Sequence, residues 1–293
     1  MKLYEIEFPL ENLNLEEVES ALLEIGASSI TFLDGGDEPV LEPKAGEVRL
    51  WSDTLVRALF EESLDPARNM EHLATRLGPQ ITALARIRPV AERVWERAWL
   101  ADWKSMRFGR RLWVCPTAAD APDDPRAVVV RLDPGLAFGT GTHPTTALCL
   151  QILDALTLSG ASVIDYGCGS GILGIAALKL GAARVTAVDL DPQALIATRE
   201  NAIRNGVSSQ IETQAVPAAL QAADCVVANI LAGLLIELAP LLTDVCRPKG
   251  DLLLSGLLKT QACAVKAAYT PAFDIVQVIE RDDWCCIHAR RAA

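Results

Sequence analysis

Two hydrophobic periodicities alternate over the first ninety residues. Apolar and polar side chains alternate over residues 3–8, which is typical of a half-buried strand. Apolar residues recur at helical spacing over 15–25, just before Gly26, a C-cap signal. The other expected elements are strands over 29–33 and 48–51, helices over 54–64 and 67–77, and a strand-like run over 81–90. Together they predict a small α+β domain with a ferredoxin-like arrangement.

A different pattern, strand then turn then helix, repeats from residue 162 onward. Each strand is short and apolar, and two of them end in a polar residue, Asp189 or Asn229. Strands are expected over 163–164, 185–188, 225–228 and 251–254, and helices over 172–180, 193–205 and 231–245. This alternation predicts an α/β fold in which a doubly wound, Rossmann-like parallel sheet has helices on both faces.

The residues between these two patterns are expected to connect two domains. Trp95, Trp99 and Trp103 recur every four residues, so on a helix their rings share one face. That face docks against a domain or, alternatively, forms a substrate-facing wall. Residues 116–125 are rich in Pro, Asp and Ala and predict a loop. We therefore divide the chain into a domain over 1–92, a helical linker and loop over 93–125, and a domain over 126–293.

Composition and charge disfavour several classes of function. Lys and Arg total 27 and Asp and Glu 38, a net charge of −11, which disfavours nucleic-acid binding and suits either a basic partner or plain solubility. No apolar run is long enough for a membrane span, and acids at Glu5 and Glu7 interrupt any signal peptide, so we expect a cytoplasmic protein. The eight Cys show no CxxC spacing, so we expect neither zinc nor disulfides.

A glycine-rich loop over residues 165–174 predicts a nucleotide-type site. It follows a strand and opens a helix, where Gly167 and Gly169 let a ligand approach bare backbone. The helix N-terminus adds unpaired N–H groups and partial positive charge. About twenty residues later, Asp189 ends the next strand, where its carboxylate can accept both ribose hydroxyls of an adenosine.

The identity of this ligand is not fixed by the loop alone. The spacing of Gly169, Gly171 and Gly174 with Asp189 also matches the NAD fingerprint, and a purely structural turn is a further alternative. Three features favour S-adenosylmethionine. Asp165 precedes the first glycine, where it suits contact with a positively charged methionine moiety, directly or through water. The other two are the extra leading Gly167 and the polar end of the later strand.

Asn229 forms that polar strand end. Ligands bind beyond the carboxyl ends of strands in open α/β sheets, so Asn229 is expected in the same crevice as Gly167 and Asp189. Its oxygen and neighbouring carbonyls can orient an amine, although Asn has no titratable group and cannot be a general base. Capping of the next helix is the alternative role. Because Ile-Leu-Ala rather than Pro-Pro-aromatic follows, a flexible amine is favoured over a planar base.

The run over residues 132–146, LDPGLAFGTGTHPTT, exceeds the needs of a helix cap. Pro144 can start a helix that Thr142 or Thr145 caps. We expect the rest of the run to cover the methionine end of the ligand. In that arrangement Thr146 bonds the methionine carboxylate and Phe138 packs on the methionine chain or adenine. His143 is interpreted as structural more readily than as a base, and no general base is assigned.

Three runs together, over 132–146, 165–171 and 229–233, resemble the PrmA family of ribosomal protein L11 methyltransferases, and the resemblance extends over the whole chain. It implies a class I methyltransferase domain that binds S-adenosylmethionine over 126–293, behind a substrate-recognition domain. It also implies trimethylation of the N-terminal α-amine and lysine ε-amines of protein L11. The family's cofactor contacts fall on four residues, Thr146, Gly167, Asp189 and Asn229.

Other functions stay open at this point. The alternatives are a class I methyltransferase acting on another protein or a small amine, an NAD-dependent oxidoreductase, and a non-catalytic S-adenosylmethionine sensor. We expect a monomer that binds neither nucleic acid nor membrane. An amine must reach the site neutral, and desolvation beside a cationic sulfonium lowers its pKa, so no dedicated base is required.

Overall fold

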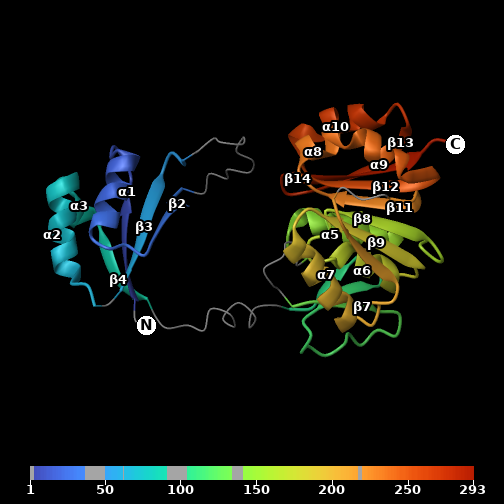
Figure 1. Cartoon of the computed structure of the whole chain (residues 1–293), viewed down its shortest axis with the longest axis horizontal. Coiled ribbons are helices and arrows are strands. Elements are labelled where there is room, and N and C mark those ends of the chain that lie inside the picture. The colour runs from blue at the N-terminus through green and yellow to red at the C-terminus, as the bar shows by residue number, and fades with distance from the viewer. Residues whose placement is uncertain (1–2, 37–49, 62, 91–103, 134–140, 217–219) are drawn as a thin grey trace. The chain divides into compact units, whose positions relative to one another are not determined.

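The computed structural model describes residues 3–36, 50–61, 63–90, 104–133, 141–216 and 220–293. The chain divides into two compact units, Met1–Ala98 and Trp99–Ala293. They share no sheet (Figure 1), and each has its own buried apolar residues. Among the described residues, no helix combines the length and apolar character that crossing a membrane requires.

The first unit is a four-stranded antiparallel sheet in the order β2-β3-β1-β4 with helices on one face. Its elements are β1 (Leu3–Pro9), α1 (Leu15–Glu24), β2 (Ser29–Asp34), β3 (Thr54–Glu61), α2 (Pro66–Leu77), α3 (Ile81–Leu84) and β4 (Arg86–Val90). Ile6 and Phe8 of β1 and Leu22 of α1 are buried in one apolar core. This βαββαβ order confirms the ferredoxin-like arrangement.

The prediction of a helix over residues 54–64 is wrong, because the strand β3 occupies Thr54–Glu61. Its burial alternates along the chain, with Val56 and Phe60 fully buried. Leu55 and Leu59, on the opposite face, add apolar positions that imitate helical spacing. Pairing with both β1 and β2 satisfies the backbone of β3, so tertiary context decides its conformation.

The second unit contains a seven-stranded sheet in the order β10-β9-β8-β11-β12-β14-β13. Its strands are β8 (Ser162–Tyr166), β9 (Arg184–Asp189), β10 (Ile211–Ala215), β11 (Ala223–Asn229), β12 (Cys246–Leu258), β13 (Phe273–Arg281) and β14 (Trp284–Arg291). The first five in spatial order are parallel, and β14 is antiparallel to both of its neighbours. The predicted doubly wound, Rossmann-like sheet is therefore confirmed.

Helices cover both faces of this sheet (Figure 1). One face carries α5 (Pro144–Ala155), α6 (Ile172–Lys179) and α7 (Pro192–Arg204), and the other carries α8 (Ala232–Glu237), α9 (Ala239–Asp244) and α10 (Ala262–Tyr269), which η1 (Lys259–Gln261) precedes. Neighbouring residues of β8 enter opposite cores, Val163 beside α5 and α6 and Ile164 beside α8 and α9. Burial on both faces explains why these strands are continuously apolar.

The range 93–125, predicted to be a linker and loop, also contains two strands. β5 (Met106–Phe108) and β6 (Leu112–Cys115) join β7 (Val128–Arg131) in a small sheet. Leu112 and Val114 are fully buried in the core that α5 and α6 share. Strands of three and four residues are too short to show a period, so the sequence could not reveal them. The three Trp of the predicted helix lie outside the described residues.

Candidate functional site

A cavity of about 430 Å³ lies at the carboxyl ends of the parallel strands. It forms where β8 has β9 on one side and β11 on the other, the topological switch point at which open α/β sheets bind ligands. The residues that line it are Thr146, Tyr166, Gly167, Cys168, Gly169, Ile172, Leu173, Asp189, Leu190, Val216, Asn229, Ile230, Leu234 and Leu238. Five of the seven residues predicted to form the site are therefore brought together.

The glycine loop is tied to the end of the neighbouring strand. The backbone N–H groups of Gly167 and Cys168 both donate to the Val188 carbonyl, at 2.8 and 3.0 Å. Gly167 has φ +76°, and a Cβ there would lie 2.3 Å from Cγ2 of Ile230. Only glycine fits this close approach, so the loop and the turn after β11 form one wall of the cavity.

Asp189 holds the opposite edge of the loop. One carboxylate oxygen accepts the Gly169 N–H at 2.9 Å, and the other accepts the Asp191 N–H at 2.9 Å. Each carboxylate oxygen keeps further acceptor capacity. Asp189 is therefore fixed in place with acceptor sites left for hydroxyl groups of a ligand in the cavity.

Asp165 lies beneath the loop and does not line the cavity. One carboxylate oxygen accepts the Gly174 N–H at 2.8 Å, and the other is buried with no partner among the described residues. Burial raises the pKa of this carboxyl to about 7. Contact of Asp165 with a positively charged methionine moiety, directly or through water, stays a prediction.

The side chains of Asn229 and Thr146 meet inside the cavity wall. The Asn229 amide donates to the hydroxyl oxygen of Thr146 at 3.3 Å, and Thr146 is fully buried. The Asn229 carbonyl oxygen is buried without a hydrogen-bond partner in the described part of the chain. The N-cap of α8 is Leu231, with no side-chain capping bond, so capping is not the role of Asn229. An unpaired buried acceptor at a cavity is suited to a ligand N–H group.

The turn that carries Asn229 is fixed by residues that the sequence did not single out. The Ile230 N–H donates to the Ser255 carbonyl at 3.1 Å. The fully buried Ser255 hydroxyl lies within hydrogen-bonding distance of the Thr145 and Cys285 carbonyls, at 3.2 and 3.3 Å. Gly256 follows with φ +85°, and a Cβ there would lie 2.3 Å from the Ile230 carbonyl oxygen. In the sequence, the glycine shortly after the apolar run over 251–254 was the one available signal.

His143, rather than Thr142 or Thr145, is the N-cap of α5, which begins at Pro144 as predicted. Its Nδ1 accepts the Thr145 N–H at 3.4 Å, and its ring packs edge-on against Trp284 with centroids 4.9 Å apart. Burial lowers the pKa of His143, which keeps the ring neutral at pH 7. Its contacts thus support the structural interpretation. Phe138 lies outside the described residues.

The electrostatics of the cavity suit a cation that also has apolar parts. Asp189 is the single formally charged side chain among its described lining residues, and no Lys or Arg opposes it. Apolar residues supply the rest of the wall, and Leu190, directly after Asp189, is 79% exposed. S-adenosylmethionine has this chemistry: a sulfonium, ribose hydroxyls and an adenine ring. The apolar lining residues were missed in the sequence because they look like ordinary core positions.

Comparisons with known proteins agree with this chemistry. The family model described as "Ribosomal protein L11 methyltransferase (PrmA)" matches residues 2–292. Proteins named ribosomal protein L11 methyltransferase from Pectobacterium carotovorum and Pseudomonas paraeruginosa are 52% and 51% identical over 281 and 280 residues, 95% of each chain. A crystal structure of ribosomal protein L11 methylase from Lactobacillus delbrueckii is 33% identical, with TM-score 0.60, and covers 65% of this chain and 100% of that one.

Proposed function

The chain belongs to the PrmA family of ribosomal protein L11 methyltransferases, and from this premise we propose that its cavity transfers methyl groups from S-adenosylmethionine to the N-terminal α-amine and lysine ε-amines of protein L11. The observation that carries the proposal is the unpaired Asn229 oxygen beside Thr146 and the glycine loop. That oxygen is an acceptor without a charge, which is what an incoming amine needs.

The residues present fit the methyl donor. Asp189 would accept the ribose hydroxyls, and the glycines of the loop would let the donor approach the backbone closely. Thr146 would bond the methionine carboxylate, and Leu190 and Val216 would cover the adenine ring. When bound, S-adenosylmethionine supplies a methyl group on a positively charged sulfur, which activates that carbon toward a nucleophile.

The protein's own task is to orient a neutral amine. A lysine amine has a pKa near 10.4 and arrives mostly protonated at pH 7. Ile230 and Leu234 make the wall beside Asn229 apolar, and burial against such a wall lowers an amine pKa. The Asn229 oxygen then accepts an amine N–H and aims its lone pair. Such positioning supplies about 7–11 kcal/mol of rate enhancement without a general base.

The first unit, Met1–Ala98, is proposed to recruit protein L11, and the second, Trp99–Ala293, to carry out the transfer. The net charge of −11 supports a basic protein partner. We further propose that the protein acts as a monomer in the cytoplasm and binds no nucleic acid.

Intact-mass spectrometry of purified protein L11, incubated with the full chain and S-adenosylmethionine, tests this function. We expect mass additions in methyl steps that map to amines by peptide analysis. An unchanged L11 mass, with the donor bound by calorimetry, would instead support a different amine substrate or a sensor.

A further inference from the structure

Two side chains of α7 hold successive carbonyl groups of the glycine loop from behind. The Thr198 hydroxyl donates to the Gly169 carbonyl at 3.1 Å, and the Asn201 amide donates to the Ser170 carbonyl at 2.8 Å. Both side chains are buried, and neither lines the cavity. Gly169 lines the cavity and Ser170 follows it, so holding both planar peptide groups by their carbonyls fixes the course of the loop where it borders the cavity. The shape of the loop at the cavity therefore depends on α7.

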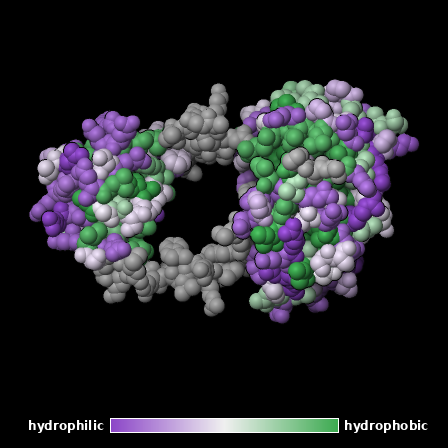
Figure 2. Space-filling view, in the orientation of Figure 1, coloured by the Kyte–Doolittle hydropathy of each residue, from purple (hydrophilic) through white to green (hydrophobic). Residues whose placement is uncertain are grey.

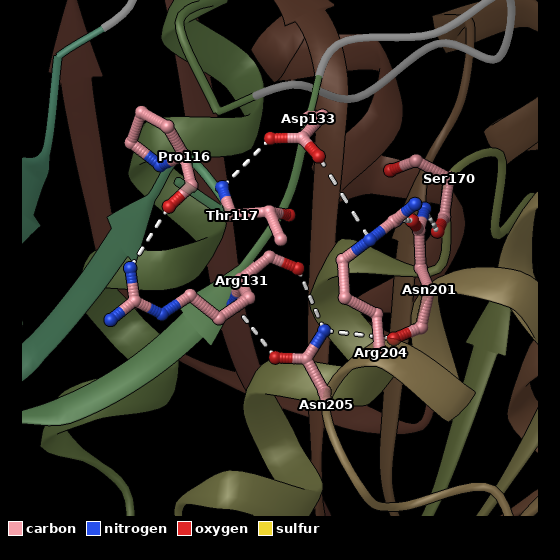
Figure 3. A network of polar contacts seen from close by, with 8 residues as sticks. All are labelled: Pro116, Thr117, Arg131, Asp133, Ser170, Asn201, Arg204 and Asn205. Carbon is pink, nitrogen blue, oxygen red and sulfur yellow. Dashed lines mark hydrogen bonds and ion pairs between the residues drawn. The ribbon is translucent and has the colours of Figure 1, made fainter. Parts of the chain in front are cut away.

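One turn further along α7, Asn205 holds the end of β7 in the same way (Figure 3). Its carbonyl oxygen accepts the Arg131 N–H at 2.7 Å, and its amide donates to the Arg131 carbonyl at 2.8 Å. The same amide also donates to the Asn201 carbonyl at 2.8 Å. The Asn205 side chain thus satisfies both backbone groups of Arg131, as a paired strand would. It also connects the end of β7 to the backbone of Asn201.

A third link joins Asn201 to Asp133, which lies two residues beyond the end of β7. The Arg204 guanidinium donates to the side-chain oxygen of Asn201 and pairs with Asp133, with 3.9 Å between Nε and Oδ2. The other Asp133 oxygen accepts the Thr117 N–H at 2.7 Å. Figure 3 shows these contacts as one continuous network that runs from Thr117 to Ser170.

We propose that Asn201, oriented by Arg204, is a positioning residue for the methyl donor. Its amide nitrogen must donate to Ser170 while its oxygen accepts from Arg204, so both ends of the amide are used. An amide is the side-chain group that offers a donor and an acceptor in this geometry. The inference rests on the proposed function, because it assumes that the glycine loop binds S-adenosylmethionine.

The test compares Asn201→Asp with Gln193→Glu in the full chain. Asp is nearly the same size and keeps an acceptor for Arg204, but it has no N–H for Ser170. Gln193 is an exposed residue of the same helix, so Gln193→Glu makes the same charge change away from the network. We expect the Kd for S-adenosylmethionine, measured by calorimetry, to rise about tenfold in Asn201→Asp and to stay within twofold in Gln193→Glu. The KM for protein L11 stays unchanged in both variants.

Arg204→Ala is a second variant that tests the same proposal if Asn201→Asp does not fold. Arg204 is an exposed residue, and its loss leaves the Asn201 amide in place but free to turn. We expect the Kd for S-adenosylmethionine to rise about threefold in this variant. Wild-type affinity in the folded variants would overturn the positioning role, as would an equal loss in Gln193→Glu. Wild-type protein that does not bind S-adenosylmethionine would instead overturn the proposed function.

Discussion

The amide nitrogen of Asn229 lies 3.3 Å from the hydroxyl oxygen of Thr146, although 83 positions separate these residues in the sequence. The contact joins the end of β11 to the first turn of α5. It engages the donor end of the amide and leaves the carbonyl oxygen as the acceptor. The direction of that oxygen is therefore set before any substrate arrives.

Asp189→Asn should weaken binding of S-adenosylmethionine by about tenfold to a hundredfold. The carboxylate accepts the Gly169 N–H, and hydrogen bonds to a charged acceptor contribute about 1.5–3 kcal/mol. Calorimetry measures the effect. Asp191→Asn is the matched control, because Asp191 caps α7 and Asn is an equally good N-cap. Equal affinities in the two variants would show that Asp189 does not contact the donor.

His143→Asn should leave kcat within about threefold of the wild-type value. Asn can still cap α5, and the lost contact with Trp284 costs about 0.5–1.5 kcal/mol of stability. Trp284→Leu removes the same contact without changing His143, and it should have a similar midpoint of thermal unfolding. A fall in kcat of a hundredfold or more, confined to His143→Asn, would identify His143 as a general base.

Asp165→Asn should gain stability relative to the wild type as the pH rises. The folded-state pKa of about 7 exceeds the ordinary value of 3.8, so the folded protein keeps a proton that the unfolded chain loses. The wild-type free energy of unfolding therefore falls as the pH rises from about 4 to 7, and an Asn side chain has no such dependence. Urea unfolding at pH 5 and pH 8 should show the difference between the proteins growing by about 2–3 kcal/mol. A constant difference would contradict this assignment.

A fragment that starts at Trp99 should bind S-adenosylmethionine but fail to methylate protein L11. It keeps the compact second unit and loses the proposed recruiting unit. A fragment that starts at Arg126 lacks β5 and β6, which exposes Val130 and Leu132, and each lost burial costs about 1.5–3 kcal/mol. Calorimetry measures binding of S-adenosylmethionine by each fragment, and mass spectrometry measures the methylation of protein L11. Full L11 methylation by the Trp99 fragment would refute a recruiting role for the first unit.

The sequence predicted the second unit well because its signals are local. The glycines of the loop over 165–174, the strands that end in Asp189 and Asn229, and the run over 132–146 can each be recognised within a few residues. Once the sheet is doubly wound, topology alone brings Thr146, Gly167 and Asn229 to one cavity. Hydrophobic residues are exposed over the part of the second unit that carries α8 (Figure 2). The apolar residues that line the cavity, such as Leu234, could not be told from core residues in the sequence.

The features that the sequence did not reveal depend on distant partners. β3 is a strand because β1 and β2 pair with it, although its residues also suit a helix. Asp165 suits a ligand contact by its place in the sequence, yet its side chain is fully buried and accepts the Gly174 N–H. The roles of Ser255 and Asn201 consist of bonds to backbone carbonyls, which leave no pattern in a single sequence.

The most direct test of the account measures Asn229→Ala beside the wild-type protein, with single-turnover methylation of protein L11 and calorimetry of S-adenosylmethionine. If Asn229 orients the amine, the methylation rate falls about a hundredfold while the Kd of the donor changes less than tenfold. A rate that stays normal at saturating donor, together with a donor Kd raised a hundredfold, would contradict the account and make Asn229 a donor-binding residue alone.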